Sequence, residues 1–313
     1  MNADMRNRQE IIEWLLAGDV SIQYQVHRDL LNEDRKDLQN RIASEGWGAL
    51  YLSKRNPDGH WGQKFYQPKW TSSHYTLLDL RNLCIAPDCR EIQETLEMIL
   101  RTEKGPDGGI RPIGSVQASD VCINGMFLNY ASYFRTAADE LESVVDFMLD
   151  QIMPDGGFNC MSNRSGAVHS SLHSTLSVLE GITEYERNGY HYRLEDLELA
   201  RQTSVEFILI HQLFKSDRTG EVIRREFLRL PYPGRWKYDI LRALDYFRYA
   251  GEEWDDRIDP ALQVLLKKRN KDLTWNVQAK HPGQVHFEME KAGRPSRWNT
   301  LRALRVMRHF QIE

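Results

Sequence analysis

Residues 105–110 read GPDGGI and residues 153–158 read MPDGGF, two copies of one turn motif. A third copy, NPDGHWG, spans residues 56–62, and weaker copies are KSDRTG at 215–220 and NKDLTW at 270–275. Pro-Asp-Gly predicts a tight turn, because proline fixes φ and glycine adopts positive φ at little cost. The aspartates of the five copies step by 49, 48, 62 and 55 residues, a spacing typical of helical-hairpin repeats.

An apolar segment follows each turn and its short polar loop, and each such segment predicts a buried inner helix. The five segments are 74–83, 122–134, 173–185, 235–247 and 297–310. In the third, Leu172, Leu176, Leu179 and Thr183 fall at i, i+4, i+7 and i+11, the stripe of a core-facing helix.

More charged segments, such as 89–104, 140–152 and 261–270, predict half-exposed outer helices between the inner ones. Three further helices are expected near 10–16, 22–31 and 38–52. Strand signals are sparse. The pattern therefore predicts an all-α fold, an α/α toroid of about six inner and six outer helices closed into a ring, with residues 1–313 as one domain.

Composition excludes several classes of protein. Hydrophobic residues make up 41% of the 313 residues and charged residues 27%, as in a soluble globular chain. No apolar run approaches the roughly 20 residues of a membrane-spanning helix, and the charged start does not resemble a signal peptide. Four cysteines are too few for a disulfide framework, and a net charge of -4 without a basic stripe argues against nucleic acid. We expect a cytoplasmic protein.

The turns, the hairpin period and the starts of the inner helices resemble the α/α-toroid superfamily of squalene and terpenoid cyclases and protein prenyltransferase β subunits. The resemblance covers nearly the whole chain as a pattern. It implies a ring around an apolar central cavity, which would take a small-molecule substrate of hydrophobic or isoprenoid character. Loops at one rim would shape its mouth. No protein partner can be predicted from the sequence.

The same resemblance implies a zinc site. In the prenyltransferase β subunits, zinc is held by the Asp and Cys of a D-x-C motif and by a His that opens a later inner helix. Here Asp120 and Cys122 stand in SDVC, and His173 opens HSTLSVLEG. Three protein ligands would leave a position open to activate water or a thiol, and Cys160 or His169 would close the site if they joined. Without a metal, Asp120 reads as a helix N-cap, Cys122 as a small buried hydrophobe and His173 as a core histidine.

Two departures from these relatives narrow the chemistry. The D-x-D-D motif with which class II terpenoid cyclases protonate an alkene is absent from the sequence. Prenyltransferases place Arg and Lys six and three residues before the aspartate to hold a diphosphate, whereas this chain has Gly114 and Gln117 there. Both departures argue against the usual reactions of these families.

A long loop before the last inner helix, residues 280–300, carries His286 and Glu288, which we expect to act as general base and acid if burial shifts their pKa values toward neutrality. Glu–Arg pairs that hold the loop down are the alternative. Substrate-binding residues are expected at or near the inner-helix starts, and they are His74, Arg235, Tyr238, Arg297 and Trp298.

These patterns predict an enzyme, a toroid with a catalytic zinc at Asp120, Cys122 and His173. A second hypothesis is a metal-free terpenoid cyclase or isomerase whose acid comes from the loop around Glu288. A third is a toroid that binds a lipid or a peptide without chemistry.

Overall fold

The structure is a computed structural model, and it describes residues 3–113 and 118–312. Six helices form an inner series, namely α2 (Val20–Val26, continued by the π-helix η1, His27–Leu31), α5 (Ser73–Asn82), α7 (Val121–Tyr133), α10 (Leu172–Arg187), α12 (Ile240–Ala250) and α14 (Arg297–His309). Six others alternate with them along the chain, namely α1 (Ala3–Leu16), α4 (Gly46–Leu52), α6 (Arg90–Glu103), α8 (Ala138–Leu149), α11 (Leu194–Ile210) and α13 (Asp259–Lys267).

The remaining elements are short. They are α3 (Lys36–Arg41), α9 (Ser162–Ser165), the 3-10 helices η2 (Lys69–Thr71), η3 (Arg225–Leu228) and η4 (Asp256–Ile258), and an antiparallel pair of two-residue strands, β1 (Trp275–Asn276) and β2 (Pro295–Ser296).

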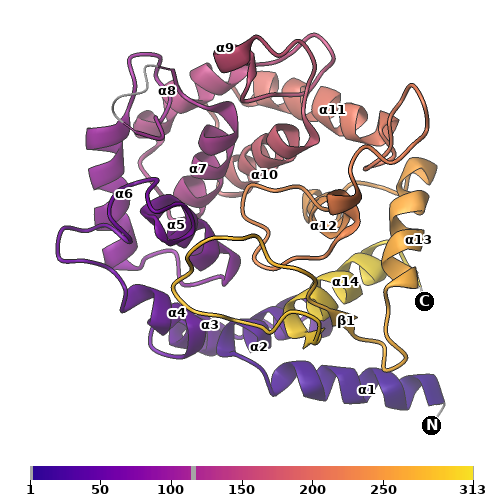
Figure 1. Ribbon diagram of the computed structural model, residues 1–313. Helices are drawn as coiled ribbons and strands as arrows, with labels where there is room; N and C mark the ends of the chain where they lie inside the picture. Colours follow the sequence, from indigo (N-terminus) through magenta and orange to yellow (C-terminus); the bar gives the residue numbers. More distant parts are fainter. Residues whose placement is uncertain (1–2, 114–117, 313) are drawn as a thin grey trace.

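The inner helices follow one another around a ring, with the outer helices outside them (Figure 1). Contacts join α5 to α7, α7 to α10, α10 to α12 and α12 to α14, and α14 also contacts α2. The amide of Gln25 on α2 donates to the carbonyl of Asn82 at the end of α5 at 3.0 Å. The predicted all-α, α/α-toroid fold is therefore confirmed.

Four of the five repeated turns share one conformation. The copy at 215–220 differs, because its positive φ falls on Gly220 and not on Arg218. Gly59, Gly108 and Gly156 have φ of 89°, 83° and 89°, the left-handed region that favours glycine. In the weaker copy at 270–275, Leu273 takes this position with φ of 61°, and its N–H donates to the carbonyl of Asn270 at 3.0 Å. The turn is thus kept even where the glycine is lost.

Each turn is tied to the helix that follows it. The N–H of Ile110 donates to Asn124 Oδ1 at 2.7 Å, and the N–H of Phe158 donates to Thr175 Oγ1 at 3.0 Å. Asn124 and Thr175 each stand two residues after the proposed zinc ligand of their helix, Cys122 or His173. The turns therefore place successive inner helices at equivalent levels, so equivalent residues lie side by side around the ring.

The closest approach within the ring is between α7 and α10. A Cβ built on Gly125 would lie 2.6 Å from the carbonyl oxygen of Ser177, and one on Gly181 would lie 2.4 Å from the carbonyl oxygen of Gly125. These distances are shorter than van der Waals contact, so both glycines are required for the two backbones to meet.

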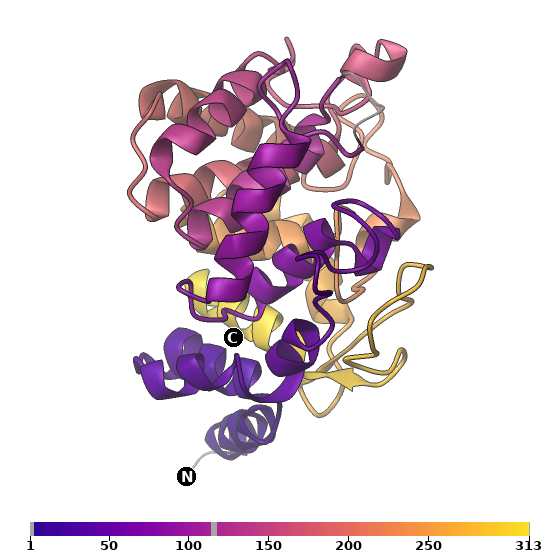
Figure 2. The same ribbon diagram turned by 90° about the vertical axis from the view of Figure 1, so that its left-hand side faces the viewer.

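Long connections cover one end of the ring, as Figure 2 shows for the segment around residues 277–296. This segment is anchored across the ring, because Nε1 of Trp70 donates to the carbonyl of Pro282 at 2.6 Å. Throughout residues 3–113 and 118–312, every helix is too short or too polar to span a bilayer.

Candidate functional site

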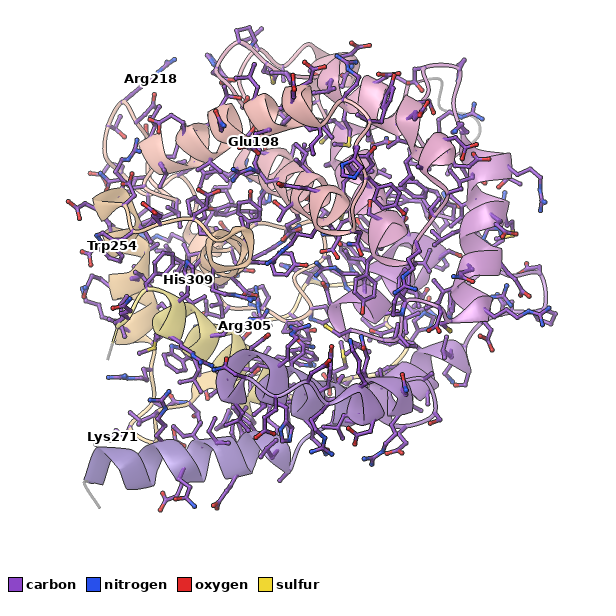
Figure 3. The ribbon with its side chains drawn as sticks, turned by 180° about the vertical axis from the view of Figure 1, so that it is seen from behind. Glu198, Arg218, Trp254, Lys271, Arg305 and His309 are labelled. Carbon is purple, nitrogen blue, oxygen red and sulfur yellow. The ribbon has the colours of Figure 1, made fainter. Side chains whose placement is uncertain are left out.

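A cavity of about 130 Å³ lies between the inner helices. Its lining includes seven arginines, which are Arg28, Arg81, Arg235, Arg242, Arg248, Arg302 and Arg305. Two carboxylates, Glu180 and Asp245, and the tyrosines Tyr133, Tyr232, Tyr246 and Tyr249 complete most of the polar surface. Figure 3 shows Arg305 on the side of α14 that faces the interior of the ring. The expected apolar cavity is therefore wrong, because charged side chains occupy the inward face of the helices.

Helical spacing explains this lining. Residues four and seven positions apart share one face of a helix. The predicted site positions at the starts of five inner helices are His74, Cys122, His173, Tyr238 and Trp298. The residue seven positions after each of them lines the cavity, and these five residues are Arg81, Asn129, Glu180, Asp245 and Arg305. Four residues after the same starts, Arg242 of α12 and Arg302 of α14 line it as well. The inward face is thus one continuous polar band.

On one side of the cavity each arginine has a carboxylate of its own. Arg242 donates to Glu180 through Nε at 2.8 Å and through Nη2 at 2.6 Å. Arg81 pairs with Glu184, whose other neighbours include the hydroxyl of Tyr249 at 2.8 Å. One pair joins α10 to α12 and the other joins α10 to α5, so both stabilise the ring. Each guanidinium charge is balanced by its carboxylate.

Arg235 belongs to the same paired side, although it comes from the connection before α12. Its guanidinium pairs with Asp79, which also accepts a hydrogen bond from the hydroxyl of Tyr51 at 2.7 Å. Burial raises the pKa of Asp79, against the opposing effect of Arg235. Arg235 has φ of 58°, and the pair holds this uncommon conformation in place.

On the other side the arginines share their carboxylates. Asp245 accepts hydrogen bonds from Arg248 Nη2 at 2.8 Å, Arg305 Nε at 2.7 Å and Arg302 Nε at 3.4 Å. Although burial favours the neutral carboxyl, Arg305 and Arg248 hold the pKa of Asp245 well below its ordinary value. The surrounding arginines therefore favour the ionised form of Asp245.

Asp29 is shared in the same way by Arg28 and Arg305, at distances of 2.6 Å and 2.9 Å. Burial raises the pKa of Asp29, but the hydrogen bond from Arg28 and the charge of Arg305 outweigh it and lower the pKa to about 2. Burial and the repulsion of Arg305 also lower the pKa of Arg248 below its ordinary value. This side of the cavity thus carries an excess of positive charge.

The predicted zinc ligands do not come together as one group. Among residues 3–113 and 118–312, no three His, Cys, Asp or Glu side chains are placed to hold a metal ion. The buried side chains of Asp120 and Cys122 act electrostatically on Lys69. Nδ1 of His173 instead accepts a hydrogen bond from the N–H of Tyr238 at 2.8 Å, and its ring packs edge-on against Trp236. The three-ligand zinc site therefore stays a prediction.

Four other residues were considered for the metal or for the diphosphate that the prenyltransferases bind, and they are Cys160, His169, Gly114 and Gln117. His169 is exposed, and its Nδ1 lies 3.9 Å from a carboxylate oxygen of Asp155. Cys160 is half-buried, and its N–H donates to the hydroxyl oxygen of Ser174 at 3.1 Å. Its side chain acts electrostatically on Lys69, as those of Asp120 and Cys122 do. Gly114 and Gln117 lie outside the described residues.

The proposed acid and base of the 280–300 loop have environments unlike those they require. Glu288 is exposed and pairs with Lys280 at 2.5 Å, and this hydrogen bond lowers its pKa. A general acid at neutral pH needs the opposite shift. His286 is half-buried, its Nε2 lies 3.0 Å from Thr76 Oγ1, and burial lowers its pKa to about 4. Neither lines the central cavity.

Two of the five expected substrate-binding residues, Arg235 and Trp298, line the central cavity. His74 is fully buried, contacts the hydroxyl of Tyr130 through Nδ1 at 3.0 Å, and burial lowers its pKa to about 3. The hydroxyl of Tyr238 donates to the carbonyl of Leu213.

Arg297, the fifth of these residues, binds the first helix instead. Its Nε donates to the carbonyl of Trp14 at 2.9 Å, and its guanidinium lies 4.7 Å from the centre of that indole ring. His74, Tyr238 and Arg297 thus support the fold around the cavity and do not line it.

Six of the seven lining arginines are absent from the residues that the sequence patterns indicate. A signal for two of them is present, since residues 241–244 and 301–304 both read LRAL, with Arg242 and Arg302 at the same place in two inner helices. An arginine that recurs within an otherwise apolar helix marks a second buried face with its own polar partners.

No protein-family model matches the chain, and no curated protein matches it in sequence. Among solved structures, the chain is similar to a polysaccharide lyase at 12% identity, with a TM-score of 0.52 and coverage of 93% of this chain and 87% of the lyase. The chain is also similar to the type II terpene cyclase MstE from Scytonema, at 12% identity, with a TM-score of 0.38 and coverage of 87% of this chain and 96% of the cyclase. At these identities the likeness to the lyase shows the fold alone.

Proposed function

We propose that this protein is an enzyme that binds a small anionic substrate in the centre of its helical ring. The observation that carries the proposal is the lining of the central cavity, in which seven arginines face two carboxylates. Arginine presents several N–H donors in a fixed plane and stays charged when buried, so it is the side chain best suited to a carboxylate or a phosphate.

The size of the cavity favours a small molecule. A volume of about 130 Å³ is below the roughly 300–1,000 Å³ of typical ligand pockets, so a polymer chain does not fit inside the ring. A polysaccharide, which the name of the similar lyase states as its substrate, would have to bind elsewhere on this protein. An isoprenoid hydrocarbon would leave the excess positive charge of the lining arginines uncompensated, at a cost in free energy.

Glu180 is the lining residue best placed to transfer a proton. Asp245 is bound by three arginines and held in its ionised form, whereas Glu180 is bound by Arg242 alone and keeps a 21% exposed side chain. A carboxylate beside a bound anion and within a closed cavity can act as general acid or base. Glu180 supports acid–base chemistry on the anionic substrate.

Thermal unfolding with a panel of ligands at constant ionic strength tests this proposal. The panel contains phosphate esters, mono- and dicarboxylates and sugar acids, with farnesol as an uncharged apolar comparison. A ligand that binds the folded state raises Tm in proportion to its saturation. We expect anions to raise Tm and farnesol to leave it unchanged.

Ligands that stabilise the protein would then be incubated with it and examined for products by mass spectrometry. Glu180→Gln should bind the same anion and form no product. Stabilisation by farnesol with no effect of any anion would overturn the proposal.

A further inference from the structure

The excess positive charge of the central cavity lies on one side of it. Four guanidinium groups, those of Arg28, Arg248, Arg302 and Arg305, form what we call the arginine cluster. The cluster is paired with two carboxylates, Asp29 and Asp245. The other three lining arginines, Arg81, Arg235 and Arg242, have three carboxylates among them. The cluster therefore has a net charge of two, four arginines less two aspartates.

Asp239 is the other carboxylate that acts on the cluster, through the charge of Arg302. It does not line the cavity, and its Oδ1 accepts the N–H of Arg242 at the start of α12. Burial raises the pKa of Asp239, which favours its neutral form. An excess of positive charge remains in the cluster with or without Asp239.

Two members of the cluster have guanidinium donors that the described part of the chain does not use. The side-chain hydrogen bond of Arg302 is its 3.4 Å contact with Asp245, and that of Arg248 is its 2.8 Å contact with the same residue. Within the described residues, the buried Nε of Arg248 has no hydrogen-bond partner. Because both arginines meet at Asp245, their remaining donors lie around one small region of the cavity.

We infer that the arginine cluster binds the phosphate group of a phosphorylated substrate, which the guanidinium groups of Arg248 and Arg302 hold beside Asp245. This inference rests on the proposed function and names the substrate class of the same cavity. A phosphate monoester carries a charge of about -1.5 to -2 at pH 7 and three acceptor oxygens on one centre. It neutralises the cluster, whereas a single carboxylate would leave half of the excess charge unpaired.

The rest of the substrate faces the paired side of the cavity. Asn129, Glu180 and Tyr133 line the cavity there. Within the described residues the buried Oδ1 of Asn129 has no hydrogen-bond partner, and the carboxylate of Glu180 is balanced by Arg242. An uncharged polar group, such as the hydroxyl-bearing part of a phosphorylated small molecule, fits these side chains. A second phosphate beside Arg81, Arg235 and Arg242 would find each of these guanidinium groups already paired with a carboxylate.

Isothermal titration calorimetry of the full chain with inorganic phosphate, compared with acetate and malonate at constant ionic strength, tests the inference. We expect one phosphate per chain, bound at least about tenfold more tightly than acetate, since charge-assisted hydrogen bonds contribute more as their number rises. Arg302→Gln should weaken phosphate binding by about tenfold, the effect of losing one charge-assisted hydrogen bond. Arg257→Gln is the matched control, because Arg257 pairs with Glu206 on the outer surface.

The outcomes separate this inference from the proposed function. Malonate or acetate binding as tightly as phosphate would overturn the phosphate assignment and leave an anionic substrate in place. Binding of no anion at all would overturn both. Should Arg302→Gln fail to fold by circular dichroism, Arg248→Gln takes its place. Phosphate binding that is unchanged in a folded Arg302→Gln or Arg248→Gln protein would show that the arginine cluster is not the site.

Discussion

Arg305 of α14 donates Nε to Asp245 of α12 at 2.7 Å, and its Nη1 reaches Asp29, next to α2, at 2.9 Å. One side chain therefore connects three inner elements of the ring across the cavity. Asp245 also accepts hydrogen bonds from Arg248 and Arg302. Its carboxylate therefore holds together the side chains where α12 meets α14.

Asp245→Asn removes this shared negative charge and leaves three buried guanidinium groups with less compensation. Removing one partner from a buried ion pair costs about 3–5 kcal/mol, so we expect a loss of that order in the free energy of unfolding. Urea denaturation followed by circular dichroism measures it. Added phosphate should restore part of the loss in the variant. A change below about 1 kcal/mol would contradict the central place of Asp245.

Stability should fall as the pH is lowered from 7 to 5, because of buried histidines. Burial lowers the pKa of His74 to about 3 in the folded protein, whereas an unfolded histidine has a pKa of about 6.5. Below pH 6.5 the unfolded chain therefore binds a proton that the folded protein excludes, so the contribution is complete above 6.5 and is lost as the pH falls toward 3.

His74→Gln tests this pH dependence. Between pH 7 and 5 its free energy of unfolding should fall by about 2 kcal/mol less than that of the wild type, since each pKa unit corresponds to about 1.4 kcal/mol. Urea titrations at both pH values measure the difference. The exposed His191→Gln serves as control and should follow the wild type. Parallel curves for wild type and His74→Gln would contradict the assignment.

Gly125→Ala should destabilise the ring even though alanine is the better helix former. Its Cβ would lie 2.6 Å from the carbonyl oxygen of Ser177, so α7 and α10 would have to move apart. Overpacking of this kind costs about 1–3 kcal/mol, which exceeds the gain of about 1 kcal/mol from helix propensity. Thermal unfolding checks the result against Glu97→Ala on the exposed face of α6. A rise in Tm for Gly125→Ala would show that the two helices do not meet closely.

Two glutamates of the 280–300 loop should respond differently to loss of charge. Glu290 is largely buried and accepts the N–H of Arg297 at 2.7 Å at the start of α14, so Glu290→Gln should cost about 1–3 kcal/mol. Glu288 is exposed and pairs with Lys280, so Glu288→Gln should change stability by less than about 0.5 kcal/mol. Urea denaturation compares the two variants. Equal effects would contradict this difference in role.

Zinc at Asp120, Cys122 and His173 stays a prediction. A site with these ligands requires about one zinc per chain in purified protein and its loss in Cys122→Ala. The hydrogen bond from the Tyr238 N–H to Nδ1 of His173 leaves Nε2 as the nitrogen available to a metal. Elemental analysis of wild type and variant measures the content. A zinc content well below one per chain in the wild type, unchanged in Cys122→Ala, would contradict the site.

The sequence predicts the fold because the repeated turns carry their own conformational requirement. Gly108 and Gly156 demand positive φ, and their spacing of 48 residues leaves room for one helical hairpin. The apolar stripe of α10, Leu172, Leu176 and Leu179, likewise predicts a buried helix, and these leucines lie in the core that α10 shares with α11 and α12.

The apolar stripe does not predict the charged lining of the cavity, because a helix inside a ring has two buried faces and the stripe marks only one of them. The second face is polar here, and its charges are balanced by residues far along the chain, such as Arg81 with Glu184, 103 residues away. A single sequence does not show which carboxylate meets which arginine. The recurring LRAL segments of α12 and α14 indicate the polar face of these helices. Its net charge depends on which arginines and carboxylates are paired, and this is known only from the structure.

The meeting of α14 with α2 also has a consequence for the order of events during synthesis. Arg28 is made well before Arg302 and Arg305, because most of the ring lies between them in the sequence. Until the C-terminal helix docks, the nascent chain is an open arc whose inner charges are exposed to water. On the proposed function, a chain that ends before α14 would lack Arg302 and Arg305 and so should not bind the anion, even with its earlier hairpins folded.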